Sequence, residues 1–298
     1  MNRKKFLLFI LTAFVFGCVS QKEWEKDSKP YFFYKVTKDQ NVIYFFGSFH
    51  VGKKEFYPLP VRVRDSFHAS HALAVEVDVE SESELKSAQN THFAPLNFKG
   101  LKSTLNQKQI KTFERAIEGT GKTFHEFESL PPAMTSIILS QIAAEKAGYD
   151  SKYGIDVHFL REARKQKKRI ISLESVQQQF SLLMNLSLPL QKAMLFQILD
   201  HWDDFPKELD ELSLQWQQGN GSEILDSQEM NNSELTANEA RDFEEKFLNQ
   251  RNFKMVDNIE KHTNENKILF VVVGAAHLWG EKGLINLMAQ KKYIVERL

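Results

Sequence analysis

The sequence predicts an α/β fold, formally α+β, in which a central mixed sheet is flanked by helices. A large helical insertion is expected between an N-terminal and a C-terminal α/β part. Two observations predict this layout. Aromatic and β-branched runs lie near both ends of the chain, at 31–46 and 268–273, and helical periodicity dominates from about 103 to 232. The composition agrees, because 13 glycines and 8 prolines are few for 298 residues, whereas 24 phenylalanines supply large core side chains.

Length and net charge limit the number of domains and the kinds of partner that we expect. A chain of 298 residues suits one large domain, and we expect it to cover 31–298, with the insertion at about 100–265. The formal net charge is zero, so the chain lacks the basic surplus that nucleic acid binding favours. No nucleic acid partner is therefore expected, and the oligomeric state stays open.

The N-terminus has the pattern of an export signal. The charged start at 2–5, with three basic residues at 3–5, precedes an apolar run from Phe6 to Phe16, which is shorter than the roughly 20 residues that span a bilayer. The single cysteine, Cys18, follows Gly17 as in a bacterial lipobox, although Phe16 departs from the usual small or aliphatic residue. We expect a signal peptide at 1–18, a polar tether at 19–30 and a protein of the bacterial cell envelope, anchored to the membrane through lipidated Cys18. An ordinary cleaved signal or a short uncleaved anchor remains the alternative.

The first part of the domain is predicted to be α/β. The runs at 31–36 and 42–46 flank a turn-like cluster at 37–41, which is typical of a hairpin. Pro60 is well placed to begin a helix at 61–71, since a proline needs no donor there. The apolar run at 72–79 then predicts a buried strand that ends in acidic residues.

Helices follow, and the chain then returns to α/β. Apolar spacings of three and four predict the helices, and a short strand at 169–173 interrupts them. The expected helices cover 105–118, 132–147, 155–168, 189–202, 206–216 and 237–262. The continuous apolar run at 268–273 predicts a strand that is covered on both faces, before a helix at 280–290 and a last strand at 293–295.

Two matching loops carry the candidate chemistry. In each, a buried-type strand is followed by a Gly-x-x-His sequence, Gly47 to His50 and Gly274 to His277. A glycine at the strand end permits a sharp turn, and the histidine then lies at the carboxyl end of the strand, where open α/β sheets bind ligands. Two such strands side by side would bring two imidazoles to one crevice, where they suit a metal site or an acid–base pair.

Carboxylates recur at comparable positions. The predicted strands at 72–79 and 169–173 end near Glu76 and Glu174. Catalytic metal sites combine about three His, Asp or Glu ligands with an open position, and Mn²⁺ also accepts this mixed set. His50, His277, Glu76 and Glu174 are therefore the candidate metal ligands, although either glutamate alone is as readily a capping or ion-pairing residue. On the residues alone, Arg251 and Asn252 are solvated side chains of a helix, and Asp156 is an acid that caps a helix start.

Several motifs together resemble the TraB/GumN family, also written TraB/PrgY/GumN. They span nearly the whole chain after residue 30, and Asn220 stands where the family usually has aspartate. The motifs are Phe46–Gly52, Tyr57–Pro60, Glu76–Asp78, Gly154–Asp156, Ile171–Glu174, Trp216–Asn220, Arg251–Asn252 and Val273–Leu278.

The resemblance implies a function class. The family is similar to the Tiki-type proteins, described as membrane-tethered metalloproteases, and to the erythromycin esterase and ChaN-like fold. It implies catalytic roles for His50, Glu76, His277 and Arg251. The leading expectation is a metal-dependent hydrolase, a peptidase acting on a peptide or small molecule, with Mn or Co favoured and Zn as an alternative. Two alternatives remain: a metal-free esterase-like hydrolase, and a non-catalytic protein that binds a peptide or haem or inhibits pheromone signalling.

Overall fold

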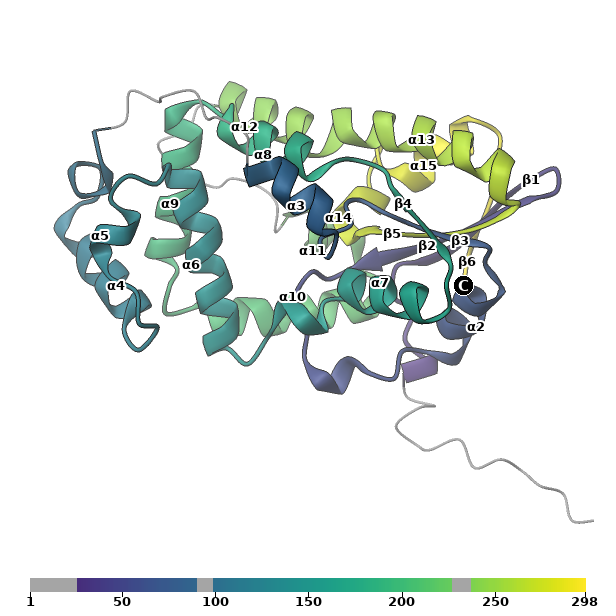
Figure 1. Cartoon of the computed structure of the whole chain (residues 1–298), viewed down its shortest axis with the longest axis horizontal. Helices are drawn as coiled ribbons and strands as arrows, with labels where there is room; N and C mark the ends of the chain where they lie inside the picture. The colour runs from purple at the N-terminus through teal and green to yellow at the C-terminus, as the bar shows by residue number, and fades with distance from the viewer. Residues whose placement is uncertain (1–25, 90–98, 227–236) are drawn as a thin grey trace, which may run out of the picture.

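The computed structural model describes residues 26–89, 99–226 and 237–298, and Figure 1 shows the arrangement of its elements. The strands are β1 (Phe33–Lys38), β2 (Asn41–Ser48), β3 (Ala72–Val75), β4 (Arg169–Ser172), β5 (Ile268–Gly274) and β6 (Ile294–Arg297). The helices are α2 (Val61–Ala69), α3 (Glu82–Gln89), α4 (Gln107–Ile117), α5 (Phe124–Phe127), α6 (Pro132–Lys146), α7 (Ile155–Lys165), α8 (Val176–Met184), α9 (Leu188–Asp200), α10 (Phe205–Gln218), α11 (Gly221–Asp226), α12 (Ala237–Glu244), α13 (Gln250–Asn266), α14 (Ala275–Leu278) and α15 (Leu284–Gln290).

The described strands form one mixed sheet in the order β4-β3-β5-β2-β1-β6. The first four strands in this order run parallel to one another, while β1 is antiparallel to both β2 and β6. Since parallel strands end at the same edge, the segments that follow β4, β3, β5 and β2 meet at one edge of the sheet. The predicted mixed sheet is confirmed, and so is the hairpin formed by β1 and β2.

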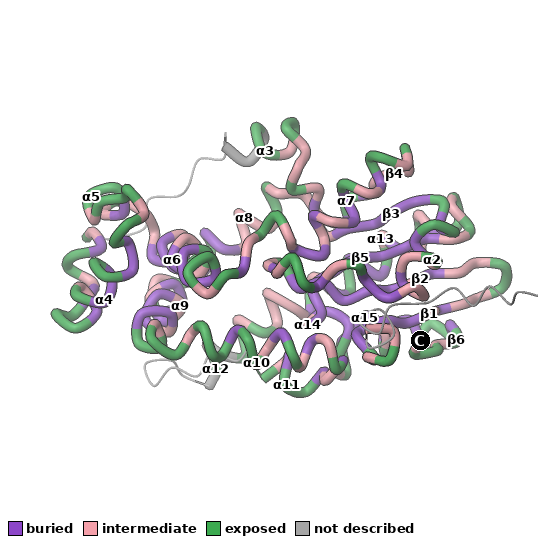
Figure 2. The backbone as a smooth tube through the Cα atoms, turned by 90° about the horizontal axis from the view of Figure 1, so that it is seen from below, coloured by how far each residue is buried: buried purple, intermediate pink, exposed green. Residues whose placement is uncertain are grey.

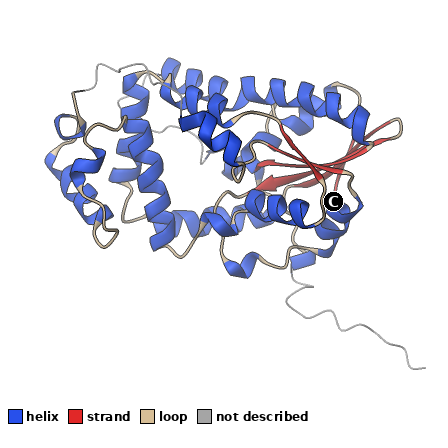
Figure 3. Cartoon of the chain, viewed as in Figure 1, coloured by secondary structure: helices blue, strands red, loops and turns tan. Residues whose placement is uncertain are grey.

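Helices cover both faces of the sheet (Figures 1 and 3). Helices α2 and α7 pack on one face, and α13 packs on the other. The strands between them are buried, as Figure 2 shows, because an apolar sheet covered on both sides excludes water. Aromatic rings fill the layer beneath the sheet, where Phe159 contacts Phe46, Phe67 and Phe270 at centroid distances of 4.9 to 6.0 Å.

The helical part has a core of its own. Helices α4, α6 and α9 pack around a cluster that includes Phe113, Leu139 and Leu195, all fully buried. The predicted insertion at about 100–265 includes the short strand that the sequence also predicts. Strand β4 lies within it and belongs to the sheet, and helices α7 and α13 pack against that sheet. Periodicity identifies these segments as a strand or a helix, but it does not say which layer each one joins.

Two predicted elements differ in detail. The strand expected at 72–79 ends at Val75, so Glu76 lies beyond the edge of the sheet. The long helix expected at 237–262 contains a π-helical turn, η4 (Glu245–Asn249), between α12 and α13. A π turn accommodates an extra residue in a helix and is common at functional sites. Here it immediately precedes Arg251, whose Nη1 donates to the Phe247 carbonyl at 3.0 Å.

The predicted signal peptide and Cys18 lie outside the described residues. The last part of the predicted tether contacts the domain: Asp27 accepts a hydrogen bond from the Val61 backbone N–H at 2.7 Å, and Arg62 donates to the carbonyls of Asp27 and Lys29. A free tether can therefore extend no further than residue 25. Within the described residues no single helix has the length and apolarity to cross a membrane. Helices α8 and α9 together have that length and apolarity, but they are bent by 97° from each other.

Candidate functional site

The predicted site residues gather at the carboxyl edge of the sheet. The four parallel strands stand side by side there, and each is followed by one candidate residue: Glu174 after β4, Glu76 after β3, His277 after β5 and His50 after β2. The register is close, since Ser48 pairs with Gly274 and Val75 with Val272. Strand order alone thus places His277 between Glu76 and His50.

Gly274 marks the point on which these side chains converge. A Cβ atom added to Gly274 would stand 3.1 Å from His50 Nε2, 3.2 Å from Glu76 Oε1 and 3.6 Å from His277 Cδ2. The backbone of Gly274 has φ −49° and ψ 136°, which any residue can adopt. This glycine is therefore required by the space that the three side chains share, and the two Gly-x-x-His loops form one site.

His50 lies at the mouth of the site, with its side chain 61% exposed. Its Nδ1 faces Asp156 Oδ2 at 3.6 Å, and Asp156 Oδ1 accepts a hydrogen bond from Ser48 Oγ at 3.1 Å. Partial desolvation by the surrounding protein lowers the pKa of His50, but the hydrogen bond and charge of Asp156 and the charge of Glu76 raise it to about 9. With this pKa His50 is a cation at neutral pH, and its Nε2 faces the space around Gly274.

His277 is buried and has the opposite tendency. Its Nδ1 lies 2.6 Å from Asn252 Oδ1, while Asn252 Nδ2 donates to the Lys282 carbonyl at 2.9 Å. Since that carbonyl only accepts, the Asn252 oxygen must face His277, and His277 donates through Nδ1–H. Burial lowers the pKa of His277 to about 4, so the imidazole is neutral. Its Nε2 then carries a free lone pair, directed toward Glu76 Oε2 at 3.8 Å.

Glu76 is the central carboxylate of the site. Its Oε1 accepts the Gly274 N–H at 2.6 Å, and its Oε2 accepts Arg251 Nη2 at 2.6 Å and Gln179 Nε2 at 3.1 Å. Burial raises the pKa of Glu76, but the charges of His277, His50 and Arg251, together with the Gly274 hydrogen bond, lower it to about 2. Glu76 is therefore ionised at neutral pH, although its side chain is only 12% exposed.

Arg251 is held by two carboxylates. Besides Glu76, Arg251 contacts Glu174, which accepts hydrogen bonds from Arg251 Nε at 2.9 Å and Nη2 at 2.7 Å. Gln179, on α8, donates to both glutamates and closes the cluster. Such a forked pair fixes the guanidinium plane. Glu174 thus positions Arg251 in this arrangement, and Arg251 presents a fixed positive charge beside Glu76.

The first loop is held from behind by the aromatic layer. Trp216, fully buried, donates its indole N–H to the Gly47 carbonyl at 2.8 Å. On the other side, the start of α7 comes so close that a Cβ on Gly154 would stand 2.4 Å from the His50 carbonyl oxygen. This approach brings Asp156, in the first turn of α7, to His50.

Replacing Trp216 with phenylalanine tests this support. Trp216→Phe leaves the buried Gly47 carbonyl without its donor, and we expect the free energy of unfolding to fall by about 2 kcal/mol. Urea unfolding measures the change. Trp202→Phe, at a half-buried tryptophan of the helical core, is the matched control. Equal effects of the two changes would show that the hydrogen bond to Gly47 contributes nothing.

His158, on the same helix α7, makes stability depend on pH. Its ring packs on Tyr57 at a centroid distance of 4.5 Å, and burial lowers its pKa from 6.5 to about 4. The unfolded chain therefore binds a proton between these values while the native state does not, so stability falls as the pH drops from 6.5 toward 4. We expect His158→Phe to reduce the loss of stability between pH 7 and pH 5 by about 2 kcal/mol, as measured by urea unfolding at both values. The exposed His68→Phe is the control, and an unchanged pH dependence in His158→Phe would contradict the assignment.

The donor set was predicted to bind a divalent metal. No group of three or more His, Cys, Asp or Glu side chains in the described part of the chain is arranged as a ready-made metal site. Arg251 contacts both Glu174 oxygens and Glu76 Oε2. His50 Nε2, Glu76 Oε1 and the His277 ring border the shared space around Gly274. Their types fit a catalytic ion. The charges also fit a divalent cation. The cluster contains three carboxylates, of Glu76, Glu174 and Asp156, and one guanidinium, of Arg251, so it has a net charge of two negative units when both imidazoles are neutral.

Some functional residues were not predicted from the residues alone. Asp156 was interpreted as a helix-capping acid and Asn252 as solvated, yet they hold His50 and His277, respectively. Gln179 carried no signal at all. Only the resemblance to a known family, which includes the positions of Asp156 and Asn252, indicated the first two.

Comparisons with known proteins agree with the motifs. The model of the TraB/PrgY/gumN family matches residues 32–297. The uncharacterized protein YbaP of Escherichia coli (strain K12) is 28% identical over 245 residues, which cover 81% of this chain and 86% of YbaP. YbaP of Shigella flexneri matches with the same values. No solved structure matches the chain.

Proposed function

Because the chain belongs to the TraB/PrgY/gumN family, we propose that it is a hydrolase, a peptidase that uses a divalent metal ion held by His50, Glu76 and His277. The observation that carries this proposal is the convergence of His50 Nε2, Glu76 Oε1 and the His277 ring around Gly274. Three donors of this kind around an open position are typical of catalytic ions, with Mn or Co favoured and Zn as the alternative.

The ion, when bound, would polarise the scissile carbonyl and acidify a water molecule. Side chains of the protein would perform the other roles in the reaction. Asp156 orients His50, and Asn252 fixes the His277 tautomer so that Nε2 faces the site. Glu174 and Gln179 hold Arg251, whose fixed guanidinium stabilises the negative charge that develops on the substrate oxygen.

Metal removal tests the proposal. The full chain is expected to bind one Mn²⁺ or Co²⁺ ion and to cleave members of a peptide library. Activity should disappear with a chelator and return when the ion is added back. His50→Gln and His277→Gln should each lose the ion, whereas His125→Gln, in the helical part, should keep it. Metal content measured by mass spectrometry decides the matter, and a chain that neither binds an ion nor cleaves any peptide in its presence would overturn the proposal.

The opposite pKa shifts of the two histidines favour a second candidate, a metal-free hydrolase. Groups whose environments drive their pKa values apart are typical acid–base partners. Neutral His277 would take the proton from an attacking water, and the His50 cation would give a proton to the leaving group. Chelator-resistant hydrolysis that His50→Gln or His277→Gln abolishes would favour this mechanism over the metal-dependent one.

We also propose that the protein is exported to the bacterial cell envelope and anchored through a lipid on Cys18. The apolar run that ends at Gly17-Cys18 supports this. Labelled palmitate should be incorporated into the wild type and not into Cys18→Ala, and an unlabelled wild type would contradict the anchor.

A further inference from the structure

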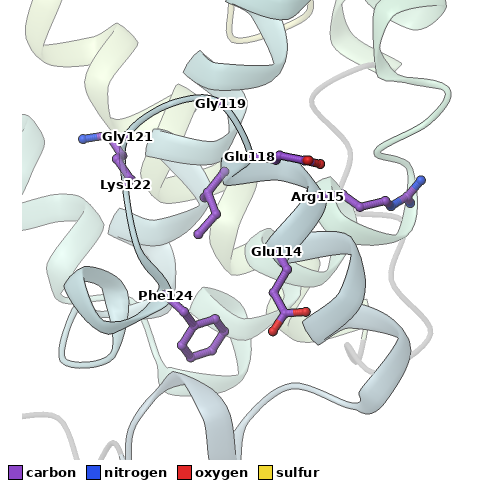
Figure 4. A pocket seen from close by; sticks show the side chains of 8 residues that line it. Glu114, Arg115, Glu118, Gly119, Gly121, Lys122 and Phe124 are labelled. Carbon is purple, nitrogen blue, oxygen red and sulfur yellow. The ribbon is translucent and has the colours of Figure 1, made fainter.

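Two cavities lie outside the catalytic cluster. The larger, of about 600 Å³, lies at the end of α4 and is lined by Phe124, Lys122 and Arg115 among others. Figure 4 shows Lys122 and Arg115 pointing away from each other, so the charged groups do not converge on a ligand. This cavity also lies at the end of the helical part that is remote from the sheet (Figure 1).

The second cavity, of about 420 Å³, adjoins the site. Its walls come from η4 and the start of α13, from α11, and from the loop after α14. Asn252 and Ala276 belong to these walls, and Asn252 is the residue that holds His277 Nδ1. Asn252 therefore links the lining of the cavity to the His277 imidazole. The volume of the cavity is within the range of about 300 to 1,000 Å³ typical of ligand pockets.

Apolar side chains form part of the lining of this cavity. Leu225 and Leu248 are half-buried, and Trp279 is 40% exposed. The indole is held in place from the other side, because a Cβ on Gly221 would stand only 2.0 Å from Trp279 Cδ2. An exposed tryptophan whose indole packs against a neighbouring helix offers an aromatic face for a ligand.

The rim of the cavity is charged and carries a net negative charge. Lys282 is neutralised by Glu245, with Nζ and Oε2 2.9 Å apart. The remaining charged residues of the lining are Arg241, Glu244 and Glu281, all exposed, which leaves one negative charge in excess. Apolar lining residues together with an excess negative charge complement a side chain that has an aliphatic stem and a cationic end. Such a side chain lays its stem on apolar surface and directs its charge toward carboxylates or an indole face.

We propose that this cavity is a specificity subsite for a lysine or arginine side chain of the peptide substrate. The inference rests on the proposed function, since the peptide would place its scissile bond at the His50 and Glu76 side of His277. The stem lies over Leu225, Leu248 and Trp279, and the cationic end reaches Glu244 and Glu281. The chain would accordingly prefer basic residues near the cleaved bond.

Binding to the full chain tests the subsite without any turnover. The probes are N-acetylarginine amide and its neutral isostere N-acetylcitrulline amide, titrated while the indole N–H resonance of Trp279 is followed by NMR. We expect the arginine probe to bind about fivefold more tightly than the citrulline probe, and Trp279→Leu or Glu281→Gln to weaken the arginine probe by about the same factor. Arg241→Gln should tighten it, because it removes the opposing charge. Trp202→Leu is the control and should change nothing.

Two outcomes would overturn the subsite: no saturable shift at Trp279, or equal affinity for the two probes. Glu281→Gln keeps the test decisive if Trp279→Leu does not fold, because Glu281 is exposed. A protein that binds the arginine probe here but cleaves no peptide would refute the proposed function and leave only a binding site for a basic side chain. A peptidase that cleaves equally well beside basic and neutral residues would support the proposed function and refute the subsite.

Discussion

Gly274→Ala is expected to lower kcat/KM for peptide hydrolysis at least about a hundredfold while the chain still folds. The added methyl group would stand 3.1 Å from His50 Nε2 and 3.2 Å from Glu76 Oε1, in the space where we propose that the substrate or ion binds. Displacing reacting groups by a few tenths of an ångström to 1 Å costs this much in well-ordered active sites. Since the Gly274 backbone suits alanine, the free energy of unfolding should fall by only about 1 kcal/mol.

Gly47→Ala is the informative contrast. There a Cβ would stand 2.6 Å from Phe32 Cβ and 3.1 Å from Ala275 Cα, inside the packed core. This change should lower stability together with activity, because the backbone itself would have to move. Thermal unfolding and steady-state kinetics on both variants separate the two roles. Wild-type hydrolysis in Gly274→Ala would show that the reaction takes place elsewhere.

Arg251→Met is expected to lower the free energy of unfolding at pH 7 by about 3 to 5 kcal/mol. The side chains of Glu76 and Glu174 are only 12% and 9% exposed, and Arg251 is the cation that both contact. Without it, two carboxylates would face each other with little water. The pKa of Glu76 would rise from about 2, because a compensating charge is lost. The destabilisation should therefore shrink as the pH is lowered and Glu76 is protonated.

Arg161→Met provides the matched control. Arg161 pairs with Glu80 at 2.8 Å, but its side chain is 48% exposed, so its removal should cost less than about 1 kcal/mol. Adding Glu174→Gln to Arg251→Met should recover part of the lost stability, since one of the two facing charges disappears. Urea unfolding at pH 7 and pH 5 measures all four chains. Equal losses in Arg251→Met and Arg161→Met would contradict the burial argument.

Much of the fold follows from local patterns. The continuous apolar run at 268–273 predicts a strand covered on both sides, and β5 lies at the centre of the parallel strands. The π turn before Arg251 could not be predicted, because a single extra residue barely disturbs a period of 3.6. Nor does the sequence around β4 reveal that this strand joins β3 across almost one hundred residues, since that pairing depends on long-range packing.

The main residues of the candidate site could also be predicted from the sequence. The repeated Gly-x-x-His pattern and the acids at strand ends indicated which side chains meet, because strand direction determines the edge at which they emerge. The residues that hold these side chains in place could not be predicted in this way. Asn252 and Gln179 are ordinary amides on helices, and only the fold brings them to His277 and Glu76. The contact of both Glu174 oxygens with Arg251, 77 positions along the chain, could likewise not be predicted from the sequence, and the role of Glu174 as a metal ligand stays a prediction.

The central claim is that His50 and His277 act in one site, and a double-variant cycle tests it most directly. The quantity to measure is kcat/KM for the best peptide substrate in the wild type, His50→Ala, His277→Ala and the double variant. Each single change should cost about a thousandfold or more, and the double variant should be no slower than the slower single one, because either loss already disables the shared site. Losses that multiply in the double variant would mean that the two histidines act independently, and would contradict the account.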